Sequence, residues 1–173
     1  MILAPQNISV PVGGSCFAGV VGDVTNIGIG EAIASGVSGA NPAAHAFDNS
    51  TGTQWQSENA GTVASYIGWN WSAAPDTCAA LIRRLTIQQR HNATNGTKWA
   101  SSGILEVSDN LTDWTLVHSF ALSSVPSDSL GPLDTIDIPS PVLAKAARIR
   151  GTAFGGGGGV WMVAELEFIE NVS

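Results

Sequence analysis

The sequence predicts a single all-β domain, built as a sandwich or a barrel, and three observations carry that prediction. The chain has 173 residues, an ordinary length for one domain. Lys, Arg, Asp and Glu make up only 12% of it, so small polar residues must cover the surface rather than the Glu and Lys of exposed helix faces. Twenty Gly and eight Pro supply turns, and short apolar or alternating runs recur between them without helical periodicity.

Seven runs predict the clearest strands, because apolar and polar residues alternate within them and turn residues bound them. In chain order they are Tyr66–Trp71, Ile82–Arg90, Gly103–Ser108, Thr115–Leu122, Leu133–Ile138, Lys145–Ala153 and Val160–Ile169. Pro139-Ser140-Pro141 is interpreted as a turn, since proline cannot donate a ladder hydrogen bond. The five glycines Gly155–Gly159 are interpreted as the tip of a hairpin.

Residues 1–30 differ from the rest, being rich in Gly and Val and almost uncharged. We interpret them as an extra strand or two, or as an arm that packs on a neighbour, with the sandwich over residues 31–173. Cys16 and Cys78 are too few for a disulfide framework and match no zinc spacing. Two buried thiols are the expected state, and one disulfide is the alternative.

The charge of the chain argues against two classes of partner. Seven basic and fourteen acidic residues give a net charge of −7, whereas nucleic acids and anionic membranes are bound by clustered Lys and Arg. No apolar stretch reaches the eighteen residues of a membrane-spanning helix. The N-terminus lacks the basic and apolar regions of a signal peptide, so we expect synthesis in the cytoplasm.

One segment, His45–Trp55, has the character of a cation loop. It reads His-Ala-Phe-Asp-Asn-Ser-Thr-Gly-Thr-Gln-Trp. Its carbonyls, carboxylate and hydroxyl suit a hard cation, with Trp55 anchoring the loop in the core. Asp-Asn-Ser is also an ordinary turn, so the segment alone leaves both interpretations open.

Further motifs follow this segment in order. His45–Trp55 resembles the A-F-D-G-N-x-x-T-x-W signature of discoidin domains, also called coagulation factor 5/8 type C domains and carbohydrate-binding module family 32. Five later segments are similar to further strands of that family: Tyr66–Asn70, Ile82–Ile87, Leu105–Trp114, Ala147–Ala153 and Val163–Phe168. The resemblance covers residues 31 to 170 and implies an eight-stranded jelly-roll β-sandwich of the galactose-binding-domain type.

The resemblance also implies a structural cation, usually Ca²⁺, although Na⁺ would fit the same donors. The residues at the family's ligand positions are His45, Asp48, Ser50, Thr53, Ala164 and Glu165. Asn49 stands where the family usually has Gly, at a place expected to need positive φ, which Asn tolerates best after Gly. The alternative is that Asp48 and Glu165 only cap surface turns.

Sugar-binding members of the family carry their ligand in loops at one end of the sandwich. The matching positions here are Gln56, Arg90, Asn95 and Phe154, and Glu58, Asn59 and Trp99 are further candidates in the same loops. Arg and Asn can pair with vicinal hydroxyls, and an aromatic face can stack on a sugar ring. Gln56 replaces the family's His, so the sugar is not specified. A solvated strand end for Arg90 and core packing for Phe154 are the alternatives.

No nucleophile elbow, zinc-protease or phosphate-loop motif occurs, so we expect no enzyme. Two functions remain. The first is a glycan-binding module, carried on a virion as an attachment or decoration protein. The second is a structural protein of a phage head or tail, whose sandwich contacts other copies or other particle subunits.

Overall fold

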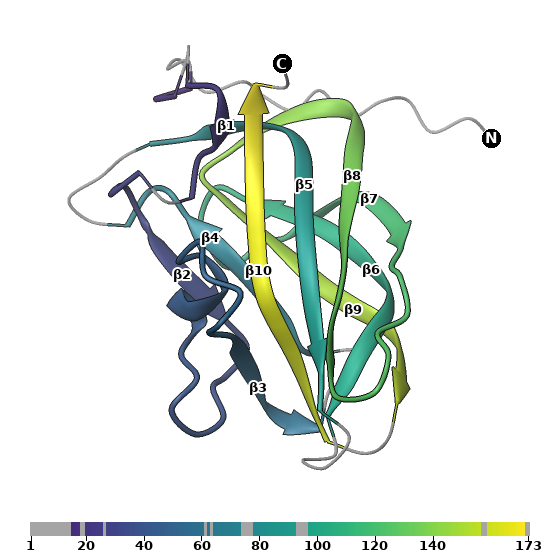
Figure 1. Cartoon of the computed structure of the whole chain (residues 1–173). Helices are drawn as coiled ribbons and strands as arrows, with labels where there is room; N and C mark the ends of the chain where they lie inside the picture. The colour runs from purple at the N-terminus through teal and green to yellow at the C-terminus, as the bar shows by residue number, and fades with distance from the viewer. Residues whose placement is uncertain are drawn as a thin grey trace.

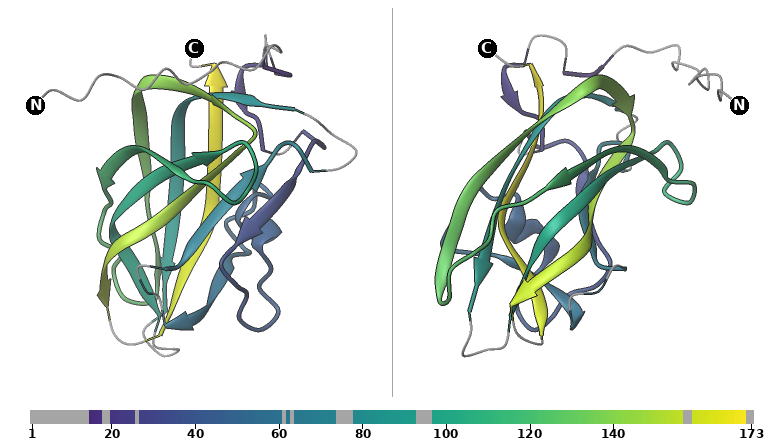
Figure 2. Two further views of the ribbon diagram at one scale, coloured as in Figure 1. Left: turned by 180° about the vertical axis from the view of Figure 1, so that it is seen from behind. Right: turned by 90° about the vertical axis from the view of Figure 1, so that its right-hand side faces the viewer.

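A computed structural model shows the predicted β-sandwich, built from two facing sheets (Figures 1 and 2). It describes residues 15–17, 20–25, 27–60, 62, 64–73, 78–92, 97–156 and 159–171, without the side chains of residues 59 and 60. The strands of this described part are β1 (Gly22–Asp23), β2 (Glu31–Ala34), β3 (Trp55–Ala60), β4 (Tyr66–Asn70), β5 (Ala80–His91), β6 (Lys98–Ser108), β7 (Thr115–Ala121), β8 (Ser129–Ala144), β9 (Ala146–Gly156) and β10 (Val160–Asn171). The all-β jelly-roll prediction is therefore confirmed, with short edge strands added to the expected eight.

The first sheet is antiparallel and centres on β10. Strand β5 pairs with one edge of β10, and β8 pairs with β5. On the other edge of β10, β3 pairs near its beginning and β1 near its end. The last strand of the chain is thus the central strand of this layer, as Figure 1 shows.

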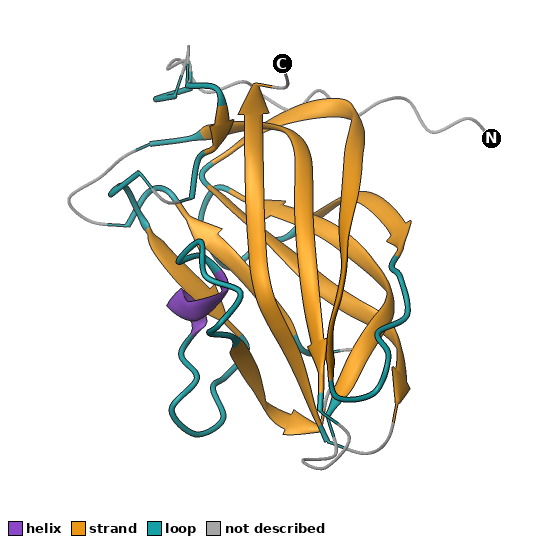
Figure 3. Cartoon of the chain, viewed as in Figure 1, coloured by secondary structure: helices purple, strands orange, loops and turns teal. Residues whose placement is uncertain are grey.

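The second sheet has the order β2-β4-β9-β6-β7, and each neighbouring pair is antiparallel. A single parallel bridge, Trp161 with Lys98, joins it to the first sheet where β6 and β10 begin. Figure 3 shows the short helix η1 (Ala43–Ala46) beside β2 and β3. None of the helices in the described residues is long and apolar enough to cross a membrane.

The core lies between the two sheets and is dominated by large aromatic side chains. Trp55, Trp71 and Trp161 are fully buried, as predicted for Trp55. The Trp161 ring packs edge-on against Trp55 at 5.5 Å and against Phe154 at 5.8 Å between ring centroids. Buried Gln89 accepts a 2.8 Å hydrogen bond from the Trp161 indole nitrogen, so the polar atoms of this region are paired as burial requires.

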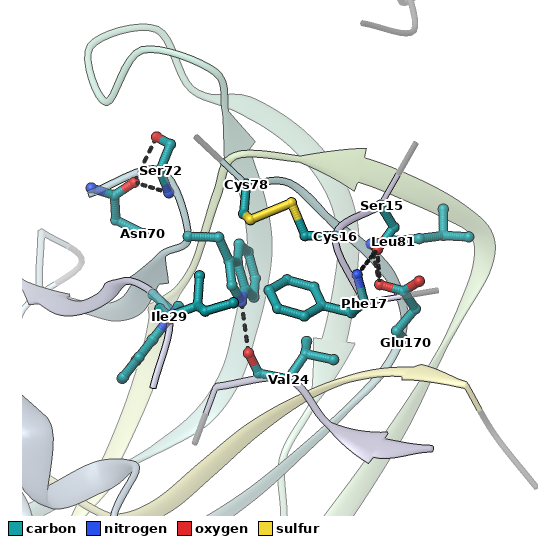
Figure 4. Close-up of a disulfide and its surroundings, with 12 residues drawn as sticks. Ser15, Cys16, Phe17, Val24, Ile29, Asn70, Ser72, Cys78, Leu81 and Glu170 are labelled. Atoms are coloured by element: carbon teal, nitrogen blue, oxygen red, sulfur yellow. Dashed lines mark hydrogen bonds between the residues drawn. A yellow bond between two sulfur atoms is a disulfide. The ribbon is translucent and has the colours of Figure 1, made fainter. Parts of the chain in front are cut away.

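Cys16 and Cys78 form a disulfide, so the expectation of two thiols is wrong (Figure 4). The two residues are 62 positions apart, and a chain separation of this size gives no local signal for pairing. Around the bond, Phe17 is buried, and the Trp71 indole donates a 2.8 Å hydrogen bond to the Val24 carbonyl. These contacts attach the described part of residues 1–30 to the end of the sandwich where β5 begins.

Two predicted turns have different roles in the structure. Strand β8 continues through Pro139–Pro141, but its pairing with β5 stops at Asp137 and resumes at Val142, so a bulge accommodates the prolines. The strands that flank the glycine run, β9 and β10, pair with different strands and do not form the predicted hairpin, and residues 157 and 158 lie outside the described residues. The prolines interrupt the ladder as predicted, but the predicted turn at Pro139–Pro141 and the predicted hairpin of β9 with β10 were wrong.

Candidate functional site

The predicted cation loop, residues 48–53, lies against β10 and contains most of the predicted oxygen donors. The Thr53 hydroxyl donates to the Asp48 carboxylate at 2.8 Å and lies 2.9 Å from the Ser50 carbonyl oxygen. The Ser50 N–H donates to the same carboxylate at 3.0 Å. Asp48, Ser50 and Thr53 therefore form one compact group of oxygen atoms.

Glu165 approaches this loop from β10, although it is separated from it by more than one hundred positions. Its carboxylate accepts hydrogen bonds from the backbone N–H groups of Asn49 at 3.3 Å and Ser50 at 3.0 Å. Glu165 is 8% exposed. Burial raises the pKa of Glu165 to about 7; the Asn49 N–H opposes this, and the Asp48 charge adds to it. The raised pKa means that keeping both the Asp48 and Glu165 carboxylates charged here costs free energy. A bound cation would offset that cost, so the arrangement suits a cation site.

Asn49 has a φ of 57°, as predicted from its place in the loop. This backbone conformation is open to glycine and, at a small cost, to asparagine. It turns the N–H groups of Asn49 and Ser50 toward Glu165, which fixes the shape of the loop.

The remaining predicted cation ligands would contribute through their backbone carbonyls. His45 lies in η1, and Ala164 is fully buried in β10 beside Glu165. Among the described residues, no three His, Cys, Asp or Glu side chains cluster at metal-binding distance. A cation at this loop would therefore depend on carbonyl and hydroxyl oxygens together with two carboxylates, which is the donor chemistry of Ca²⁺ or Na⁺ rather than of zinc.

Arg90 connects the cation loop to the end of β5. Its terminal guanidinium nitrogen donates to the Thr51 carbonyl, so the side chain reaches across to the loop instead of extending freely into solvent. Its Nε is buried and has no hydrogen-bond partner. The guanidinium is thus held against the loop by its terminal nitrogen.

Trp99 and Phe154 lie against glycine backbone. A Cβ on Gly155 would lie 2.5 Å from the Trp99 ring, and one on Gly151 would lie 2.3 Å from Phe154. The glycines therefore allow both rings to pack closely. Trp99 also contacts the His91 ring edge-on at 4.9 Å, and Phe154 packs on Trp161, so each ring has at least one face covered by protein.

The other predicted sugar ligands are spread over several elements, with Gln56 and Arg90 on the two strands that flank the beginning of β10. Gln56 is half-buried in β3 and pairs with Met162, while exposed Glu58 lines a separate 100 Å³ pocket with Ser35 and Ser65. Asn95 and the side chain of Asn59 are outside the described residues. Of the predicted cation ligands, Asp48, Ser50, Thr53 and Glu165 are joined by hydrogen bonds.

A pocket of about 170 Å³ lies where β5 ends and β8 begins, and we call it the β5–β8 pocket. Its lining residues are Arg90, His91, Asn92, Asp128, Ser129 and Leu130. Sequence reasoning found only Arg90 among them. The loop before β8 shows no motif in the sequence, and the pairing of His91 with Ser129 is visible only in the folded chain.

The family of the chain follows from a direct comparison of its sequence. The F5/8 type C domain matches residues 31–166, so the chain belongs to that family, as the motifs predicted. Among curated proteins, none matches the sequence.

Solved structures of similar fold are carbohydrate-binding modules. A chitosan-binding module from a chitosanase/glucanase of Paenibacillus sp. IK-5 is 25% identical with a TM-score of 0.64, over 86% of this chain and 98% of that one. A family 32 module from NanJ of C. perfringens, solved in complex with galactose, is 22% identical with a TM-score of 0.61, over 80% of this chain and 92% of that one. A second Paenibacillus chitosan-binding module, solved with chitotriose, is 20% identical with a TM-score of 0.62, over 81% of this chain and 95% of that one.

Proposed function

We propose that this protein is a non-catalytic glycan-binding module. Its membership of the F5/8 type C family and its likeness to modules solved with galactose and chitotriose support the proposal. The observation that carries it is the position of Arg90, which is oriented by the cation loop and lines the β5–β8 pocket. A guanidinium has five N–H donors, so Arg90 has more than the one that binds Thr51 and is a suitable partner for sugar hydroxyls.

We include a structural Ca²⁺ in the proposal, held by the carbonyls of His45, Ser50 and Ala164 and by the side chains of Asp48, Thr53 and Glu165. The close approach of the Asp48 and Glu165 carboxylates supports a bound cation, and the all-oxygen donor set suits Ca²⁺, with Na⁺ as the alternative. Such an ion would neutralise the two carboxylates. The loop would then hold the Thr51 carbonyl in place for Arg90.

We also propose that the module works outside the reducing cytoplasm, displayed in several copies on a virion as an attachment or decoration protein. The Cys16–Cys78 disulfide supports an oxidising location. The small pocket supports multivalent display, because a site for one sugar unit binds weakly and repeated copies raise the apparent affinity.

The second candidate function is assembly of a phage head or tail, and a specific observation favours it. Leu116 on β7 and Leu133 on β8 are each 56% exposed, on strands of opposite sheets. Exposed apolar side chains on strands of both sheets could contact other copies of the chain or other particle subunits.

A glycan array on the purified protein in Ca²⁺, with light scattering after size exclusion on the same sample, tests the two functions together. The glycan-binding proposal predicts selective binding to at least one class of neutral glycan. If no glycan binds while the protein forms a defined oligomer or attaches to particles, the assembly function replaces it.

A further inference from the structure

The outer face of the second sheet carries three charged side chains that interact. Leu105 and Ile149 lie in the core, and side chains alternate along a strand, so their neighbours point away from the core. These neighbours are Glu106 on β6 and the two arginines of β9. The Glu106 carboxylate accepts from Arg148 at 2.8 Å and from Arg150 at 2.9 Å. Because two arginines share one carboxylate, one positive charge is left over on this face.

Two aromatic rings hold this group in place. The Arg148 guanidinium lies 4.4 Å from the ring centroid of Tyr66 and 4.0 Å from that of Trp114. The Trp114 indole also donates to the Leu111 carbonyl at 3.1 Å. Arg, Tyr and Trp often dominate the binding energy of protein interfaces, and side chains that already hold one another lose little freedom on binding. We call the whole group the arginine cluster: Tyr66, Glu106, Trp114, Arg148 and Arg150.

The arginine cluster belongs to a row of residues that crosses the whole sheet. The paired positions on β2, β4, β9, β6 and β7 are, in that order, Ile33, Gly68, Arg148, Glu106 and Leu116. Residues paired across strands share one side of a sheet, so Leu116 lies on the same side as Glu106. Leu116 is 56% exposed at the edge of the sheet. This face therefore combines a fixed, positively charged cluster with an apolar side chain that is open to solvent.

The outer face of the first sheet has the opposite charge. Leu166 lies in the core, so Glu165 and Glu167 on β10 point outward, and the Thr86 hydroxyl donates to Glu167 at 2.8 Å. Asp23 on β1 is also near: burial is the main cause of the raised pKa of Asp23 and of Glu165, and the Glu167 charge adds to both. The three ion pairs of the described residues involve none of these carboxylates. We call Asp23, Glu165 and Glu167 the acidic stripe.

The acidic stripe resembles the arginine cluster in having an exposed leucine at the edge of its sheet. Glu165 pairs with Gln88, and Gln88 pairs with Leu133 on the edge strand β8. Leu133 is 56% exposed. Ca²⁺ at the cation loop would neutralise Glu165 but leave the charge of Glu167. The two faces are therefore complementary in charge whether or not the cation is bound.

Two copies of the chain can use these faces together. The faces lie on opposite sides of the sandwich, as the two sheets in Figure 2 show. Contact between like faces would bring charges of the same sign together, whereas contact between unlike faces brings opposite charges together. A contact between unlike faces leaves each copy with a free face, so it can repeat into an open chain or close into a ring.

We propose that the outer face of the second sheet binds the outer face of the first sheet in another copy of this chain. The arginine cluster of one copy meets the acidic stripe of the next. Arg150, whose side chain is 30% exposed, is the arginine that reaches Glu167. This inference rests on the assembly function proposed above, and it names the partner and both surfaces. It does not depend on glycan binding.

Sedimentation of the full chain in Ca²⁺, over a concentration series from micromolar to millimolar, tests the proposal. We expect the average mass of the wild type to rise with concentration. Arg150→Glu and Glu167→Arg should each weaken association at least tenfold, because each brings like charges together. An equimolar mixture of the two variants should recover association, because every contact then joins opposite charges again.

Two further variants separate the contact from other effects. Leu116→Ser changes no charge and should weaken association with an unchanged melting temperature, because Leu116 is mostly exposed. Asp109→Arg is the matched control, since it makes the charge change of Glu167→Arg beside Ala144, in the loop after β6, and should associate as wild type. Wild-type association in Glu167→Arg, or a loss that mixing does not recover, would overturn the proposed contact.

The outcomes also separate this inference from the functions beneath it. If the wild type stays monomeric throughout, the assembly function and these surfaces both fail. If it associates but neither charge variant changes the association, only the two surfaces are wrong. Glycan binding is measured by the array and stands or falls independently of these results.

Discussion

The two ends of β5 are stabilised in different ways. At the Ala80 end, the Cys16–Cys78 disulfide and the buried rings of Phe17 and Trp71 close the sandwich with a covalent bond and apolar packing. At the His91 end lies what we call the site region, which comprises η1, the cation loop and the β5–β8 pocket. It is held by hydrogen bonds within the cation loop and from that loop to Glu165 on β10.

The buried polar atoms without a hydrogen-bond partner are also unevenly distributed between the two ends of β5. Three of the four found in the described residues, His45 Nδ1, Arg90 Nε and His91 Nδ1, belong to the site region. A fold that leaves buried donors unpaired in one region loses stability there and must regain it elsewhere. Stability and binding are thus placed at opposite ends of one strand, and the predictions below test that separation.

The largest expected effect comes from removing the disulfide. Replacing both Cys16 and Cys78 with Ser frees a chain segment of 62 residues and should lower the free energy of unfolding by about 4 kcal/mol. Denaturant unfolding of the variant and wild type measures the change. Glycan affinity at a temperature where the variant is still folded should remain at the wild-type value, and a parallel loss of affinity would contradict the separation of the two ends.

Calcium should stabilise the site region by a smaller amount. At a free ion concentration of 100 times its Kd, mass action predicts about 2.7 kcal/mol, or roughly 5–10 °C in melting temperature for a chain of this size. Melts in Ca²⁺ and in EDTA measure this. Asp48→Ala should abolish the difference. A wild-type melting temperature that is the same in Ca²⁺ and in EDTA would refute the cation assignment.

Without the cation, the buried carboxylate of Glu165 should make stability depend on pH. Its pKa is about 7 in the folded chain against 4.5 for an exposed Glu, so the folded state holds a proton that the unfolded state has released. The contribution of Glu165 to stability should therefore be greatest below pH 4.5, fall by on the order of 2 kcal/mol as pH rises to 7, and then level off.

Unfolding in EDTA across this pH range measures the fall, and Glu165→Gln should remove it. Saturating Ca²⁺ should also remove it, because the ion favours the charged carboxylate. A fall that Glu165→Gln leaves in place would belong to another group.

The smallest effect concerns backbone strain far from the site region. Leu111 has a φ of 63° in the β6–β7 loop, which costs a branched residue more than it costs Asn49 at 57°. Leu111→Gly should raise stability by about 0.5–1 kcal/mol, whereas Asn49→Gly should be close to neutral. Thermal melts of both variants compare them, and a destabilising Leu111→Gly would show that the exposed leucine has a packing role.

Much of the fold was predictable from local pattern. Alternation placed the seven clear strands, and the loop sequence predicted positive φ at Asn49, because both depend on residues close together in the chain. The Cys16–Cys78 bond and the pairing of β9 and β10 with different strands depend on partners far away, and no short window of sequence contains them.

The candidate site also has a part that local sequence predicts and a part that depends on distant residues. Asp48, Ser50 and Thr53 lie within six residues and formed a recognisable motif, and family resemblance added Glu165. His91 and Asp128 meet only because β5 and β8 pair at their ends, and neither stands in a motif. A pocket formed by strand pairing can therefore be found in the structure, but no motif in the sequence indicates it.

The most direct test of the account is the effect of Arg90→Ala on affinity for the best glycan from the array. We predict a loss of more than about 1.5 kcal/mol, roughly tenfold, with little change in melting temperature, because Arg90 is oriented for binding rather than for folding. Arg84→Ala is the matched control on the same strand, where the side chain pairs with exposed Asp137 at 2.6 Å, and it should bind as wild type. Wild-type affinity in Arg90→Ala, or an equal loss in Arg84→Ala, would contradict the central claim.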